Sequence, residues 1–125
     1  MVTELMVRNV DQSIAFYQRY LKCEISNKLI VENQIRWAEV QTPKGSRLQF
    51  YGIVDFINEI GEFRGEEPRA SIVLIFEVDE IENTWNEVKD KIVIVDPLKT
   101  KDYGAIEFKF KDPDGYIIQL TQRIN

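Results

Sequence analysis

The stretch TPKGSRLQF at residues 42–50 returns 70 positions later as DPDGYIIQL at residues 112–120. Both copies read Thr or Asp, Pro, Lys or Asp, Gly, two variable residues, Leu or Ile, Gln, and Phe or Leu. A repeat of this length in a chain of 125 residues indicates two copies of one structural unit. Each copy places a glutamine, Gln49 or Gln119, at the same position.

The turn inside each copy predicts the register of a β-hairpin. Pro-x-Gly is typical of a type I turn followed by a glycine at positive φ, the three-residue hairpin loop. The first hairpin then pairs Glu39 with Gln49 and Trp37 with Tyr51. The second hairpin pairs two sets of residues in the same way: Lys109 with Gln119 and Phe108 with Leu120.

Residues on alternate sides of these hairpins differ in polarity. One side is apolar and is expected to pack on a helix: Ala38, Val40, Leu48, Phe50, Phe108, Phe110, Ile118 and Leu120. The other side is mixed and is the candidate for binding: Trp37, Glu39, Arg47, Gln49, Tyr51, Glu107, Lys109, Ile117, Gln119 and Thr121.

The elements around the two turns follow one order. Short apolar runs predict strands near 2–7 and 71–78, and Asn9 and Asp79, again 70 residues apart, are placed to cap a helix that follows each strand. Further strands are predicted at 23–31, 35–41 and 46–52, and at 92–95, 105–111 and 116–121. Each unit therefore reads β-α-β-β-β, and the fold class is α+β.

We expect one domain over residues 1–125, with module one at 1–52, a connection at 53–69 and module two at 70–125. The connection contains four large apolar residues, more than a flexible linker usually has: Phe56, Ile57, Ile60 and Phe63. A short helix is predicted there, packed on the domain or on a partner chain.

Composition excludes several classes of function. The net charge is −5, and acidic and basic residues are interspersed, which argues against nucleic acid as a partner. No apolar run approaches the roughly 20 residues of a membrane span, and the first residues have no basic region typical of a signal peptide, so we expect a cytoplasmic protein. The single cysteine, Cys23, is expected to be a buried small hydrophobe. With no histidine, the chain has no Ser-His-Asp or Cys-His arrangement.

Two segments carry a family resemblance. VRNVDQSIAFY at 7–17 and FKDPDGYIIQL at 110–120 resemble the vicinal oxygen chelate superfamily, which includes glyoxalase I, bleomycin-resistance proteins, fosfomycin-resistance enzymes and extradiol dioxygenases. With the β-α-β-β-β order, the resemblance covers nearly the whole chain. It implies two βαβββ modules that form a cupped mixed sheet around a cavity, usually in homodimers.

The resemblance also implies which positions would hold a metal. Metal-dependent members take His or Gln from the first strand of each module and Glu from the last strand. Those positions fall here on Val2, Val73, Gln49 and Gln119. Valine donates nothing, and an amide lacks the carboxylate charge that hard cations favour, so we expect no metal and no cofactor. Only a displaced site built from carboxylates would change this expectation: Glu4, Glu39, Glu77 and Glu107.

Our first hypothesis is metal-independent binding of a small organic molecule in the cavity between the modules. Trp37 and Tyr51 would stack on a flat or apolar group. Hydrogen bonds would come from the polar residues of the same side: Glu39, Arg47, Gln49, Lys109 and Gln119.

Two alternatives belong to other classes. A glyoxalase-like lyase or isomerase, or a dioxygenase-type enzyme with a non-classical site, would use Glu39 or Glu107 as a general base and Lys109 or Arg47 to stabilise an enolate-like charge. The same residues also read as cross-strand pairs with a structural role only. A ligand-sensing interaction module would instead work through a dimer surface that includes residues 53–69.

Overall fold

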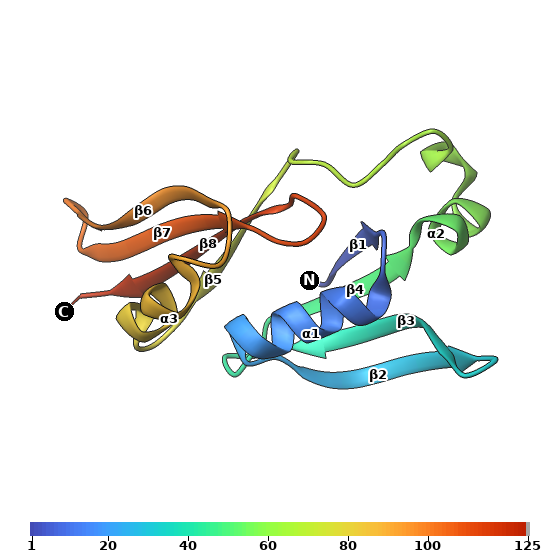
Figure 1. Ribbon diagram of the computed structural model, residues 1–125, viewed down its shortest axis with the longest axis horizontal. Coiled ribbons are helices and arrows are strands. Elements are labelled where there is room, and N and C mark those ends of the chain that lie inside the picture. Colours follow the sequence, from blue (N-terminus) through green and yellow to red (C-terminus); the bar gives the residue numbers. More distant parts are fainter. Residues whose placement is uncertain (125) are drawn as a thin grey trace. The chain divides into compact units, whose positions relative to one another are not determined.

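The computed structural model describes residues 1–124 and has an α+β fold with two four-stranded mixed sheets. The chain divides into two compact units, Met1–Arg69 and the part from Ala70 onward. Each unit runs β-α-β-β-β through its sheet (Figure 1). The prediction of two βαβββ modules is confirmed.

The first unit builds a sheet in the order β1-β4-β3-β2. β1 runs parallel to β4, and the other neighbours are antiparallel. Helix α1 lies across one face of this sheet (Figure 1). The elements are β1 (Thr3–Val7), α1 (Val10–Leu21), β2 (Glu24–Val31), β3 (Gln34–Gln41) and β4 (Arg47–Gly52).

Helix α1 begins where its sequence predicts. The Asn9 side chain accepts a hydrogen bond from the backbone N–H of Gln12 at 2.9 Å, which satisfies one of the free donors of the first turn. Lys22 ends the helix in a left-handed conformation, with φ of 57°. The helix buries Val10, Ile14, Tyr17 and Leu21 against the sheet, and the centroids of the Tyr17 and Phe50 rings lie 5.0 Å apart.

The two repeated turns have the same backbone. Gly45 and Gly115 have φ of +95° and +90°, a conformation that glycine adopts without a steric penalty. In the first turn Thr42 N–H donates to the Ser46 carbonyl at 2.8 Å, and in the second Asp112 N–H donates to the Tyr116 carbonyl at 3.0 Å. The predicted registers are confirmed in both hairpins: Glu39 with Gln49, Trp37 with Tyr51, Lys109 with Gln119, and Phe108 with Leu120.

The connection after β4 contains the expected short helix. Helix α2 spans Ile53–Glu59, and a 3₁₀ turn, η1, follows at Gly61–Phe63. Phe56 is buried, and its ring centroid lies 6.4 Å from that of Tyr51 and 4.9 Å from that of Phe63. The helix therefore packs on the strands of its own unit.

The second unit builds a sheet in the order β5-β8-β7-β6, with β5 parallel to β8. Helix α3 packs on β7 and β8, where the Trp85 and Phe108 ring centroids lie 5.2 Å apart. The elements are β5 (Val73–Glu77), α3 (Ile81–Val88), β6 (Ile94–Lys101), β7 (Ala105–Lys111) and β8 (Ile117–Arg123).

Two local expectations are wrong in this unit. Asp79 does not cap α3: the N-cap position is Glu80, in a left-handed conformation, and it makes no capping hydrogen bond with its side chain. The acceptor comes from β8 instead, because Gln122 Oε1 receives the N–H of Ile81 at 2.7 Å. The strand expected at 92–95 begins only at Ile94 and continues to Lys101, through two irregularities in its pairing with β7.

Cys23 is buried, as expected. Burial raises the pKa of its thiol to about 12, so the group is protonated at neutral pH. No helix within residues 1–124 is both long enough and apolar enough to cross a membrane.

Gln122 offers a test of the tertiary cap. Gln122→Ala removes the acceptor of the Ile81 N–H, and we expect it to lower the free energy of unfolding by about 1 kcal/mol. Gln18→Ala, at an exposed position of α1, is the control and should change it by less than about 0.5 kcal/mol. Urea unfolding followed by circular dichroism measures both. Equal stability of Gln122→Ala and the parent would contradict the cap.

Candidate functional site

A pocket of about 340 Å³ lies on the side of the first sheet that does not carry α1. Trp37 on β3 and Tyr51 on β4 form it together with Gln49, because side chains two residues apart along a strand project to the same face. Three predicted ligand-binding residues are therefore in one pocket. Its other lining residues are Glu4, Leu29 and Glu59.

Glu39 stands next to Gln49 and is held by two side-chain donors. Gln49 Nε2 donates to its Oε1 at 3.0 Å, and the Ser26 hydroxyl donates to its Oε2 at 2.9 Å. These hydrogen bonds, the one from Gln49 first, lower the pKa of Glu39, and the charge of Arg47 acts in the same direction. Glu39 is therefore an ionised and positioned carboxylate.

The two aromatic residues also face carboxylates. Trp37 Nε1–H donates to Glu4 Oε2 at 3.3 Å, and the Tyr51 hydroxyl interacts with Glu59. Burial raises the pKa of Tyr51, and the negative charges of Glu59, Asp55 and Glu4 raise it further. The pocket thus combines aromatic walls with a negative electrostatic field.

Sequence reasoning missed part of this wall. Glu59 lies at the end of α2, and neither its spacing nor its type relates it to the repeat. Leu29 lies on β2, opposite Trp37 in the ladder. Glu4 was considered only for a displaced metal site, although its position on β1 opposite Gln49 places it on the same face. The sequence alone does not indicate that β1 pairs with β4 in parallel, and this pairing is what brings Glu4 to the pocket.

The remaining predicted residues lie elsewhere. Arg47 is exposed at the start of β4. In the second unit, Lys109 is opposite Gln119, and its Nζ lies 3.3 Å from Asp96 Oδ2. Gln119 Nε2 donates to Thr121 Oγ1 at 3.0 Å. Lys109, Gln119 and Thr121 share one face of the second sheet.

Glu107, the other candidate base, is buried with donors on both of its oxygens. The Tyr103 hydroxyl donates to Oε1 at 2.6 Å and Thr121 Oγ1 to Oε2 at 3.3 Å. The hydrogen bond to Glu107 raises the pKa of Tyr103. This arrangement ties β7, β8 and the β6–β7 turn together.

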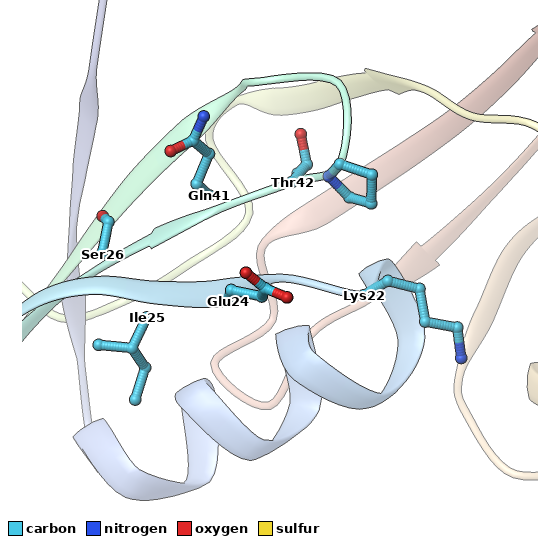
Figure 2. Close-up of a pocket in the computed structure, with 7 residues that line it drawn as sticks. Lys22, Glu24, Ile25, Ser26, Gln41 and Thr42 are labelled. Carbon is cyan, nitrogen blue, oxygen red and sulfur yellow. The ribbon is translucent and has the colours of Figure 1, made fainter.

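A second pocket, of about 480 Å³, lies at the other end of the β2–β3 ladder. Its lining residues do not converge: Figure 2 shows Gln41 and Lys22 pointing apart and Ile25 pointing towards α1. Specific small-molecule sites need polar groups aimed at one place. The Trp37–Tyr51 pocket is therefore the better candidate.

Comparison with known proteins identifies the family. Residues 2–120 match the model of the Glyoxalase/Bleomycin resistance protein/Dioxygenase superfamily. The chain belongs to this superfamily. The search of curated proteins returned no match.

Solved structures share the fold of this glyoxalase-superfamily chain at low sequence identity. TioX from Micromonospora sp. ML1 has a TM-score of 0.74 and 18% identity, over 99% of this chain and 98% of TioX. TnmS3, an antibiotic binding protein from Streptomyces sp. CB03234, has a TM-score of 0.70 and 17% identity, over 98% and 93%. A glyoxalase/bleomycin resistance protein/dioxygenase family enzyme from Burkholderia phytofirmans PsJN has a TM-score of 0.77 and 13% identity, over 98% and 97%.

The residues of this superfamily member do not fit the metal of its metal-dependent relatives. Gln49 and Gln119 stand where the resemblance places metal-binding carboxylates, and both amide nitrogens donate to neighbouring side chains. Val73, at the start of β5, offers no donor atom. Within the described part of the chain, no three His, Cys, Asp or Glu side chains are grouped closely enough to hold a metal ion.

The Glu39 network has a pH dependence with a definite sign. A lowered pKa in the folded state stabilises the fold above the unfolded pKa, and this stabilisation is lost as the pH falls through the folded value. Gln49→Leu removes the first donor, and we expect the pKa of Glu39 to rise. Gln34→Leu, at an exposed position of β3, should leave it unchanged. Carbon-13 NMR titration of the side-chain carboxyls measures both variants, and an unchanged Glu39 midpoint in Gln49→Leu would refute the assignment.

Proposed function

We propose that this chain binds a small organic molecule, without a metal, at the Trp37–Tyr51 pocket of its first unit. The observation that carries the proposal is the pair of cross-strand aromatic side chains in a pocket of about 340 Å³. Ligand pockets in proteins have volumes of roughly 300–1,000 Å³ and combine apolar walls with a few placed polar groups. The existence of an antibiotic binding protein with this fold supports the same class of function.

Catalysis is the weaker alternative at this pocket. A general base works best with a pKa near the operating pH. The hydrogen bonds from Gln49 and Ser26 move the pKa of Glu39 in the opposite direction and make it a poorer base than an ordinary glutamate. Both oxygens of Glu107 already accept hydrogen bonds within its own unit.

The partner that the family resemblance implies is a second copy of the chain. We include a homodimer in the proposal on that ground. One chain has a mass of 14.7 kDa, so sedimentation equilibrium should give twice that mass. A monomer mass at all concentrations would contradict the homodimer and leave the ligand site untouched.

Three naphthalene probes of nearly equal size test the binding site: 1-naphthylmethylamine, 1-naphthylmethanol and 1-naphthoate. We expect saturable shifts of the Trp37 indole N–H signal in NMR titrations with at least one of them. Stacking on an aromatic wall contributes about 1 kcal/mol or more, so Trp37→Leu should weaken that binding roughly tenfold. Isothermal titration calorimetry measures the affinity of this variant, because it lacks the indole signal. An excess of EDTA should change nothing.

The matched control is Trp85→Leu. It also removes a half-buried indole, but from the interface between α3 and Phe108. Affinity should stay within about twofold of the parent, since Trp85 does not line the pocket. Equal losses in both variants, or no shift of the Trp37 signal with any probe up to its solubility limit, would overturn the proposed site.

A further inference from the structure

The hydrogen-bond donors of the Trp37–Tyr51 pocket are directed at carboxylates. The indole N–H of Trp37 is directed at Glu4, the hydroxyl of Tyr51 at Glu59, and the amide nitrogen of Gln49 at Glu39. Carboxylates are acceptors only when ionised. A molecule in this pocket therefore meets two aromatic side chains and a surrounding set of acceptor oxygens.

The charge of the pocket points in the same direction. Among its six lining residues in the described chain, Glu4 and Glu59 are acidic and none is basic. The nearby guanidinium of Arg36 is already paired with Asp55, through two hydrogen bonds of 2.8 and 2.7 Å. That pairing lowers the pKa of Asp55 and raises the pKa of Arg36, so both remain ionised.

The chemistry of the walls selects one class of ligand. An anion would meet the like charges of Glu4 and Glu59, the carboxylates towards which the Trp37 indole N–H and the Tyr51 hydroxyl are directed. A cation gains from both features, because the faces of Trp and Tyr attract positive charge and carboxylates accept hydrogen bonds from N–H groups. Aromatic and acidic groups thus act together.

We propose that the ligand of this pocket is an organic cation: a flat or aromatic group that carries a protonated amine or amidinium. The ring system would lie against Trp37 and Tyr51, and the N–H groups would donate to Glu59 or Glu4. This inference rests on the proposed function, because it names the ligand class of the same pocket.

The three naphthalene probes separate the inference from the function on which it rests. At neutral pH they carry charges of plus one, zero and minus one on one ring system. We expect 1-naphthylmethylammonium to bind at least about tenfold more tightly than 1-naphthylmethanol, and 1-naphthoate to bind most weakly. The advantage of the cation should fall as sodium chloride is added, because salt screens exposed charges.

Variants of the two carboxylates identify the source of the preference. Glu59→Gln keeps the size of the side chain and removes its charge, so it should lower the affinity for the cation several-fold and leave the alcohol unaffected. Glu62→Gln is the matched control: it removes an exposed carboxylate from η1, outside the pocket. Glu4→Gln is the second test on a different element, in case Glu59→Gln disturbs α2.

The outcomes are distinct. The inference is supported if the protein prefers the cation, if Glu59→Gln and Glu4→Gln both reduce this preference, and if Glu62→Gln leaves it unchanged. Binding of the alcohol or the naphthoate as tightly as the cation overturns the inference and leaves the proposed function standing. Absence of any Trp37 shift with all three probes overturns both.

Discussion

A side-chain oxygen and a glycine fix the geometry of both hairpins. In the first turn Thr42 Oγ1 accepts the N–H of Ser46 at 3.0 Å, and in the second Asp112 Oδ1 accepts the N–H of Tyr116 at 3.0 Å. The glycine three residues after each acceptor takes the positive φ that closes the loop. A shift of the register by one residue would turn every side chain of a strand to the other face. The hydrophobic contacts with α1 and α3, and the pocket on the opposite face, both depend on these turns.

The duplicated backbone does not carry duplicated chemistry. At equivalent positions the first unit has Ser26, Glu39 and Gln49, and the second has Asp96, Lys109 and Gln119. The first set presents a carboxylate that accepts from its neighbours, whereas the second presents an ammonium group beside Asp96. The same ladder positions thus carry opposite charges around an unchanged glutamine. The glutamine sits where metal-binding carboxylates are expected in relatives, and in both units its amide is used in hydrogen bonds.

Local sequence patterns predicted the fold, but they predicted only part of the candidate site. The turn residues and the alternation of side chains between the two faces of a strand predicted the pairs Trp37–Tyr51 and Glu39–Gln49. Both pairs lie within one hairpin, so a local pattern is sufficient to predict them. Gln122 reaches an N–H group 41 residues away along the chain, and Glu59 reaches Tyr51 from the far end of the helix that follows β4. No strand or turn pattern indicates where such side chains arrive. Asp79 was misassigned for the same reason, since the acceptor from β8 replaces a local cap. β6 was placed too early because Pro97 and the two pairing irregularities interrupt its alternation.

The pairing of Trp37 with Tyr51 on adjacent strands supports the register, the pocket and the proposed ligand class. Nuclear Overhauser effects between the β-protons and neighbouring backbone protons of Trp37 and Tyr51 measure this pairing directly in solution. We expect strong cross-peaks, because directly opposed residues on one face of a sheet have Cβ atoms about 4.5–5.5 Å apart. Cross-peaks from Trp37 to Phe50 in their place would show that β3 and β4 pair one residue out of register, and would contradict both the pairing and the pocket built on it.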